Sequence, residues 1–149
     1  MPRHVYRVCR AMYTRLDGSG AQRVGGRWNS RGHAVVYMAE SVALAVLENL
    51  VHLSRQDFPV GYVTVGATIP DNVEILGEEW VRALAGMPAA TPQTIGDYWI
   101  ERNLSAVLRV PSFIVRSESN YLLNPAHPEF RRIIVERPIG FEFDPRLFA

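Results

Sequence analysis

Lysine is absent from this sequence of 149 residues, and all 16 of its Lys and Arg positions are arginine. A planar guanidinium suits bidentate binding of phosphates or carboxylates. A bias toward G+C in the genome produces the same replacement without any function, so both explanations stand. The formal net charge of +1 argues against wholesale wrapping of nucleic acid or of an acidic membrane, although a local basic patch is compatible with it.

Cysteine and closely spaced histidines are also scarce. The single cysteine, Cys9, excludes an internal disulfide and a cysteine-based zinc site, and its apolar surroundings favour a small buried side chain over a nucleophile. The four histidines, at positions 4, 33, 52 and 127, show no HxH or HExxH spacing. We therefore expect no metal site.

No apolar run reaches the length of a membrane span, because Arg and Glu interrupt every hydrophobic stretch, and no signal peptide is visible. We therefore expect a soluble, cytoplasmic chain with no membrane association. The length, 48% hydrophobic content and 21% charged content are those of one globular domain with a sizeable core, spanning residues 1–149. There is no internal repeat and no low-complexity segment.

The central stretch of the chain runs from Gly25 to His52. After a glycine pair and a short loop, the apolar run 34–39 is rich in Val and too short for a helix, so it predicts a buried strand. Ser41 is a suitable N-cap for the helix that follows. Within 42–53 only Glu48, Asn49 and His52 are polar. Because such a helix is normally buried, its carboxylate needs a partner or a function.

Apolar patterns and turn residues predict the remaining elements. We expect strands at 4–8, 61–69, 73–76, 106–110, 113–115, 132–136 and 140–143, helices at 78–84 and 94–103, and a turn-rich connection at 120–125. A glycine-rich loop of roughly fifteen residues precedes the central stretch, and loops this long are often functional. The predicted fold is α+β, a curved, mostly antiparallel sheet with a few helices.

Glu48 has two interpretations from the residues alone. It is either a glutamate at the edge of the core, paired with an arginine, or a carboxylate at the floor of a cleft. In a cleft it could stabilise a developing cation or orient a hydroxyl. His52, four residues further along the same helix face, is either an orienting partner or a solvated side chain.

Arg27 follows the pair Gly25–Gly26, which allows a ligand close to the backbone, and its guanidinium offers a fork of donors to a phosphate. The alternative is a glycine turn with a surface arginine, since this is neither a GxGxxG motif nor a P-loop. Trp28 and Tyr37 could stack on a base or a nicotinamide ring, or belong to the core. Ser112 has no GxSxG around it, so nothing supports it as a hydrolase nucleophile.

Taken together, these residues resemble the RES domain, the toxin half of a class of bacterial toxin–antitoxin pairs, named after an Arg, a Glu and a Ser. The resemblance lies in Tyr6-Arg7, Gly25-Gly26-Arg27-Trp28-Asn29, Val35-Val36-Tyr37, the helix with Ala45 and Glu48, Val110-Pro111-Ser112 and Asn120-Tyr121-Leu122-Leu123-Asn124-Pro125. These short motifs follow one another in the expected order over almost the whole chain.

The resemblance implies an ADP-ribosyltransferase-like fold and NAD as a substrate, either degraded or used as an ADP-ribose donor. By the same resemblance, Arg27, Tyr37 and Glu48 form the core of the catalytic site and Ser112 completes it, with Ser117 as the alternative for the family serine. The residues implied to bind NAD are Arg7, Gly26, Arg27, Trp28, Asn29 and Tyr37. No metal is implied.

The implied chemistry suits these residue types. Cleavage of the nicotinamide–ribose bond passes through an oxocarbenium-like cation, as in glycoside cleavage, and an ionised Glu48 would stabilise that cation or hold a ribose hydroxyl. Arg27 would bind the diphosphate and help to keep Glu48 ionised. The sequence does not identify the acceptor, which is water, phosphate or a protein side chain.

The resemblance also implies a cognate Xre-like antitoxin that covers the active site, in a hetero-oligomer that meets DNA only through the antitoxin. Two rival hypotheses remain. One is a toxin ribonuclease that uses His and Arg on RNA, which the all-arginine basic set allows. The other is a non-catalytic binding module in which Arg27 and Glu48 form a structural ion pair.

Overall fold

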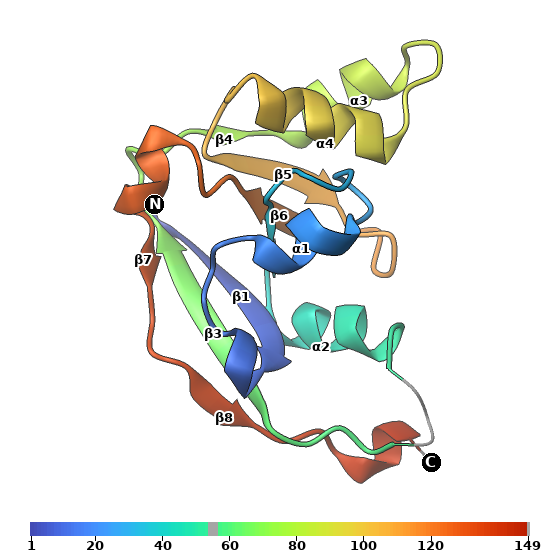
Figure 1. Cartoon of the computed structure of the whole chain (residues 1–149), viewed down its shortest axis with the longest axis vertical. Helices are drawn as coiled ribbons and strands as arrows, with labels where there is room; N and C mark the ends of the chain where they lie inside the picture. The colour runs from blue at the N-terminus through green and yellow to red at the C-terminus, as the bar shows by residue number, and fades with distance from the viewer. Residues whose placement is uncertain (54–56, 149) are drawn as a thin grey trace.

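Strand pairing defines the architecture of the computed structural model, which describes residues 1–53 and 57–148 (Figure 1). Its sheet has eight strands in the order β4-β5-β6-β2-β1-β3-β7, and β8 pairs with another part of β3. The strands are β1 (Arg3–Arg10), β2 (Val36–Ala39), β3 (Tyr62–Ile69), β4 (Ile75–Leu76), β5 (Val107–Pro111), β6 (Ser119–Leu123), β7 (Ile134–Val135) and β8 (Ile139–Phe141). The β4–β5 pair is parallel and the other pairs are antiparallel, which confirms the predicted α+β class.

Four α-helices accompany the sheet in the described ranges. They are α1 (Ser19–Val24), α2 (Val42–Leu50), α3 (Glu78–Ala85) and α4 (Pro92–Glu101), with short 3-10 turns at Ala11–Tyr13, Pro128–Arg132 and Pro145–Phe148. The predicted N-cap of α2 is confirmed, because the Ser41 hydroxyl accepts from the backbone N–H of Leu44 at 3.1 Å. None of the helices in these ranges is both long and apolar enough to cross a bilayer.

The two faces of the sheet have separate apolar clusters. On one face, Val5 and Cys9 of β1 belong to a core with residues of β2, β3, β5 and β6. On the opposite face, Val8 and Ala39 pack against Leu44 and Ala45 of α2. Because side chains alternate along a strand, α2 covers only the face that Val8 shares.

A second helical layer covers another part of the face that carries α2. There Ile95 and Trp99 of α4 pack with Trp28 against buried side chains of β5 and β6, such as Leu108 and Leu122. Figure 1 shows the two layers apart, with α3 and α4 beside β5 and with α2 near the end of β1. Residues that lie between them on this face are therefore placed to form a site.

Two predicted segments are wrong. Residues 120–125 are not a turn-rich connection, because 119–123 form β6 inside the sheet. Tyr121, Leu122 and Leu123 are fully buried, and a strand buried on both faces shows no alternation that would predict it. Residues 113–115 do not continue the sheet, because the Ser112 hydroxyl accepts from the N–H groups of Ile114 and Val115 and closes a turn instead.

The glycine-rich loop also differs from the prediction, because α1 lies within it. Gly20 lowers the helical propensity of this segment, so the sequence pattern did not predict a helix there. The Asp17 carboxylate accepts from the N–H of Ser19 at 3.0 Å and marks the beginning of the helix. The remaining predicted strands and helices are confirmed, with ends shifted by a few residues.

Candidate active site

Glu48 projects from α2 toward the sheet. The helix is fixed by the buried side chains of Leu44 and Ala45 and by the Asn49 amide, which donates to the carbonyl of Val8 at 2.8 Å. These contacts hold the helix against β1. The position of Glu48 therefore follows from apolar packing of the helix rather than from its own contacts.

The Glu48 carboxylate receives two hydrogen bonds on the same oxygen. The hydroxyl of Ser112 donates to Oε1 at 3.1 Å, and the side-chain amide of Asn120 donates to Oε1 at 2.9 Å. Within the described residues, Oε2 accepts no hydrogen bond and no arginine lies within ion-pair distance. A partly exposed carboxylate with one fixed and one free oxygen can hold a hydroxyl or stabilise a cation.

Arg27 lies near the same region, because its side chain contacts the loop between β5 and β6. Its guanidinium carbon lies 4.1 Å from the centroid of the Phe113 ring, and Phe113 follows Ser112 directly in the chain. The Arg27 side chain is exposed and makes no ion pair with the described residues. Its fork of donors is available to an anionic ligand.

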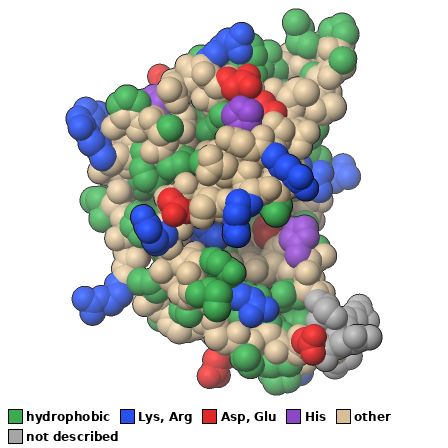
Figure 2. Space-filling view, viewed as in Figure 1, with side chains coloured by type: hydrophobic (Ala, Val, Ile, Leu, Met, Phe, Trp, Pro, Cys, Tyr) green, Lys and Arg blue, Asp and Glu red, His purple; other side chains and the backbone are tan. Residues whose placement is uncertain are grey.

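Figure 2 shows a hollow in the middle of the molecular face, with basic side chains around and inside it. In the same orientation, Figure 1 places this hollow between α1, which leads into the Arg27 loop, and α2, which carries Glu48. The surface is thus concave and basic where the two elements meet, as a site for an anionic ligand requires.

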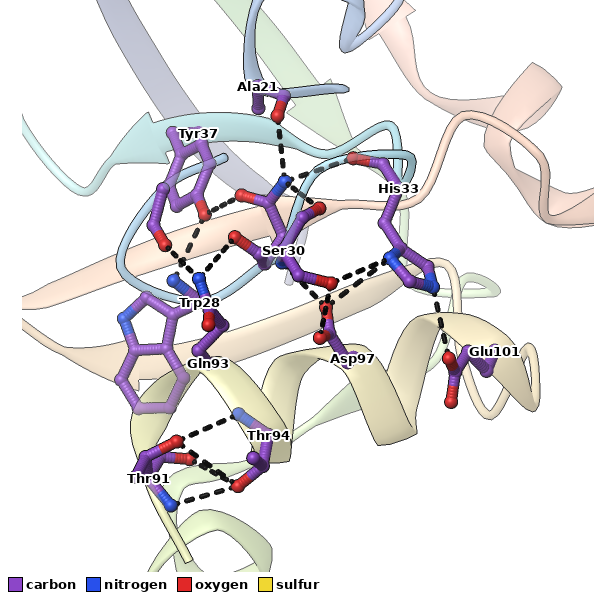
Figure 3. A network of polar contacts seen from close by, with 12 residues as sticks. Ala21, Trp28, Ser30, His33, Tyr37, Thr91, Gln93, Thr94, Asp97 and Glu101 are labelled. Atoms are coloured by element: carbon purple, nitrogen blue, oxygen red, sulfur yellow. Dashed lines mark hydrogen bonds and ion pairs between the residues drawn. The ribbon is translucent and has the colours of Figure 1, made fainter. Parts of the chain in front are cut away.

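The neighbours of Arg27 in its loop serve the scaffold (Figure 3). Asn29 is fully buried, and its amide donates to the carbonyls of Ala21, Ser30 and His33. The Tyr37 hydroxyl donates to Asn29 Oδ1 and accepts from the N–H of Trp28. Burial raises the pKa of Tyr37 to about 12, so its phenol remains a donor at neutral pH.

Gly26 and Trp28 belong to the same scaffold. A Cβ on Gly26 would lie 2.7 Å from the Tyr37 hydroxyl oxygen, so only glycine leaves room for that ring. Trp28 is 4% exposed and packs between α4 and the sheet, with its ring centroid 6.2 Å from that of Phe113. Of the loop residues implied to bind NAD, Arg27 has an exposed side chain that makes no ion pair with the described residues.

A second set of contacts anchors this loop on α4 (Figure 3). Asp97 accepts from the backbone N–H of Ser30 at 2.9 Å and from its hydroxyl at 2.7 Å. His33 hydrogen-bonds Ser30 and Glu101 at 3.2 and 3.1 Å. Gly96 allows the close approach, because a Cβ there would lie 1.7 Å from the Trp28 carbonyl oxygen.

Arg7 is not brought to Glu48. Because side chains alternate along a strand, Arg7 lies on the same face of β1 as Val5 and Cys9, which is the face opposite α2. It lies beside Cys9, where burial raises the pKa of the thiol and the nearby Arg7 charge partly offsets that rise. The expectation that Cys9 is a small buried side chain is confirmed.

Two further residues were missed by the sequence reading. Asn120 contacts Glu48 directly, and it would have emerged as a candidate if 119–123 had been recognised as a strand beside β2. Phe113 holds Arg27, but an apolar residue in a turn gave no signal of that contact. Of the two candidate serines Ser112 contacts Glu48, whereas Ser117 is exposed, as is His52.

No group of three or more His, Cys, Asp and Glu side chains that could hold a metal ion occurs among residues 1–53 and 57–148. The described side chains around Glu48 and Arg27 present several groups that can act on a ligand. These are a carboxylate with one oxygen that accepts no hydrogen bond from the described residues, an exposed guanidinium and two donors that orient the carboxylate.

Comparisons with known proteins identify relatives of this chain. A "Toxin Res" of Yersinia enterocolitica serotype O:8 / biotype 1B is 40% identical over 149 residues, covering 96% of this chain and 98% of the relative. A "Prs ADP-ribosylating toxin" of Sphingobium sp. (strain YBL2) is 39% identical over 140 residues, covering 89% and 86%. A chain in the crystal structure of the M. tuberculosis MbcT–MbcA toxin–antitoxin complex superimposes with a TM-score of 0.71 at 17% identity, covering 99% of this chain and 87% of that one, and supports the fold.

The family comparison covers nearly the whole chain. The RES domain family matches residues 4–144, a range that contains the Arg27 loop, α2 and the turn at Ser112. The order of these motifs in the sequence and their meeting in space agree with that match. The chain belongs to the RES domain family.

Proposed function

We propose that this chain is the toxin of a toxin–antitoxin pair and that it cleaves the nicotinamide–ribose bond of NAD. The observation that carries the proposal is an exposed Arg27 guanidinium beside the turn of Ser112, whose hydroxyl holds Oε1 of Glu48 while Oε2 accepts no hydrogen bond from the described residues. Family membership and the names of the relatives support the toxin role.

Each residue has a distinct part in the proposed reaction. Arg27 binds the diphosphate of NAD through its fork of donors. The bond between C1′ of the ribose and the pyridine nitrogen breaks, and its electron pair leaves with neutral nicotinamide. The negative charge of Glu48 stabilises the cation that remains on the ribose, or holds a ribose hydroxyl through Oε2.

The acceptor then bonds to C1′ and loses a proton to solvent or to a base. With water the product is ADP-ribose. With phosphate it is ADP-ribose that carries the phosphate on the same ribose carbon, and with a protein side chain it is an ADP-ribosylated protein. The name of the Sphingobium relative, an ADP-ribosylating toxin, supports transfer to a protein. We therefore place a protein acceptor first and treat the other two as outcomes of the assay.

Tyr37 and Ser112 act in this proposal through the loops that they hold. The Tyr37 hydroxyl is bonded to the loop of Arg27, so a role for this residue toward NAD would fall to its ring. Ser112 donates to Glu48 and fixes the turn that carries Phe113. The position of Arg7 on the other face of β1 gives no support to a role in the same cleft.

The proposed inhibitor is a cognate antitoxin that covers the cleft in a hetero-oligomer, in the cytoplasm. Four exposed apolar side chains lie within three residues of Glu48 or Ser112 in the chain and form what we term the apolar rim, which consists of Leu47, Val51, Phe113 and Ile114. A partner with apolar side chains for this rim and a carboxylate for Arg27 would match it chemically. The structural neighbour, taken from a toxin–antitoxin complex, supports such a partner.

The purified chain, free of any antitoxin, provides the test. It is incubated with NAD in phosphate buffer that contains the proteins of a cell lysate, with the lysate alone as the blank, and separately with total RNA, and the loss of each is followed. We expect NAD to disappear with release of nicotinamide while the RNA stays intact. Loss of RNA with NAD intact would establish the ribonuclease alternative, and loss of neither would favour a binding module.

Cells provide an independent measurement. Expression of the chain alone should arrest growth and deplete NAD, and co-expression of the neighbouring gene should reverse both. High-level expression of the unmutated chain without harm to the host would count against the toxin role.

A further inference from the structure

We propose that Asn120 is a positioning residue for the reaction, which acts by fixing the Glu48 carboxylate. The inference rests on the proposed function and adds a residue that neither the family name nor the sequence motifs single out for this task. Asn120 lies on β6, opposite Ala39 of β2 and Val110 of β5. Its side chain therefore rises from the floor of the sheet beneath Glu48.

Both donors to Glu48 converge on one oxygen. Asn120 and Ser112 donate to Oε1, and this arrangement directs Oε2 away from the protein donors. A carboxylate held by one donor can rotate about its last bond, whereas two donors from different elements fix its plane. The geometry keeps the free oxygen in one direction for the substrate.

The other end of the Asn120 side chain is unusual. Its Oδ1 is buried and accepts no hydrogen bond from the described residues. An unpaired buried acceptor costs free energy, so the amide is a poor choice for stability alone. The reversed amide would place Oδ1 against the carboxylate, so the observed orientation keeps the N–H end on Glu48. The side chain is used for its donor.

Two variants of Asn120 and one control variant of an exposed asparagine test this role. Asn120→Ala removes the donor and leaves space, whereas Asn120→Asp fills the same space but replaces the donor with a second carboxylate. Asn72, exposed in the turn after β3, supplies the control Asn72→Ala. Thermal unfolding is measured for each variant so that turnover is compared between folded proteins.

A positioning role predicts that Asn120→Ala lowers kcat for NAD cleavage about 10- to 100-fold, with KM changed by less than about 3-fold. Asn120→Asp should have a lower kcat than Asn120→Ala, because its carboxylate and that of Glu48 then face one another. A role in packing alone predicts the reverse order, since Asp keeps the shape of Asn. Asn72→Ala should match the parent.

The result that overturns the inference is a folded Asn120→Ala with the parent's kcat, or an Asn120→Asp that exceeds Asn120→Ala. Should Asn120→Asp fail to fold, the kcat of Asn120→Ala decides alone. Failure of the proposed function looks different, because in that case the parent protein itself would not consume NAD.

A second, independent observation concerns Phe113. We infer that its ring positions Arg27, because the guanidinium carbon lies 4.1 Å from the ring centroid and Arg27 makes no ion pair with the described residues. Phe113 is 46% exposed, which is unfavourable for a phenylalanine with only a packing role. A stacked guanidinium keeps its N–H groups free in the plane of the fork, ready for a diphosphate.

Phe113→Leu and Phe113→Tyr separate this role from simple packing. Leu lacks the π face, so we expect the KM for NAD to rise about 3- to 10-fold with kcat nearly unchanged, whereas Tyr should restore the parent's KM. Tyr98 stacks on Arg102 at 3.9 Å on α4, and Tyr98→Leu is therefore a matched control expected to leave KM unchanged. A Phe113→Leu protein with the parent's KM, or equal effects of Leu and Tyr, would overturn the inference.

Discussion

The loop that carries Arg27 is held by many polar contacts, whereas the helix that carries Glu48 is held mainly by apolar packing. The buried Asn29 of the loop and the Asp97 carboxylate of α4 bind backbone groups of the loop, and the Arg27 side chain is exposed. On the helix, Leu44 and Ala45 supply the packing, and Glu48 itself is bound. From this difference we expect substitutions around Arg27 to change the stability of the protein and substitutions around Glu48 to change its turnover.

The largest effect on stability is expected at the contact between the loop and α4. Gly96→Ala would place a Cβ 1.7 Å from the Trp28 carbonyl oxygen, which is backbone and cannot move aside cheaply. We expect a loss of about 3 kcal/mol or more in the free energy of unfolding, or failure to fold. Urea or thermal unfolding measures it.

Gly20→Ala is the matched control for that substitution. Gly20 lies within α1, and a Cβ there meets nothing within 4 Å. Alanine should therefore stabilise the protein by about 0.5–1 kcal/mol through its higher helical propensity. Equal stability of the two variants would show that α4 does not support the loop as described.

The next effect concerns substrate binding by the free side chain of the loop. Arg27→Lys keeps the charge but loses the planar fork, so the KM for NAD should rise about 10-fold or more with a smaller change in kcat. Arg31→Lys, at an exposed position in the same loop, should leave KM unchanged. Steady-state kinetics decides, and an unaltered KM for Arg27→Lys would assign Arg27 a structural role.

A smaller effect is expected from the Tyr37 hydroxyl. Tyr37→Phe leaves the buried Asn29 oxygen and the Trp28 N–H without their partner. The free energy of unfolding should fall by about 1–3 kcal/mol at neutral pH. No change in stability would mean that other groups or water satisfy these two atoms.

The same hydroxyl should make stability depend on alkaline pH. Burial raises the pKa of Tyr37 from its ordinary value of 10.0 to about 12, so between these values the unfolded chain binds fewer protons than the folded one. Stability from this group is complete below pH 10 and is lost as the pH rises toward 12. The advantage of the parent over Tyr37→Phe should therefore shrink by about 2–3 kcal/mol across that window, as measured by denaturant unfolding.

Local patterns were enough to predict much of the fold and part of the site. The alternation in β1 and β3 and the cap at Ser41 identified the central sheet and α2 correctly. Periodicity failed for β6, because Tyr121 to Leu123 are buried on both sides and resemble no half-exposed strand. Failing to recognise β6 also meant missing Asn120, whose contact with Glu48 joins segments far apart in the sequence.

The different contacts of the residues in the Arg27 loop could not be predicted either. Gly26, Arg27, Trp28 and Asn29 stand together in the sequence, and all four were expected to contact NAD. Only the tertiary contacts with Tyr37 and α4 distinguish the scaffold from the free guanidinium. That Gly26, Trp28 and Asn29 also contact NAD stays a prediction.

The central claim is that the charge of Glu48 drives cleavage of NAD. Glu48→Gln is nearly isosteric, and purified parent and variant proteins are compared for NAD consumption and, by calorimetry, for NAD binding. We expect a folded variant that still binds NAD but turns it over about 1,000-fold more slowly, because the cationic transition state has lost its counter-charge. A folded Glu48→Gln protein that consumes NAD at close to the parent's rate would contradict it.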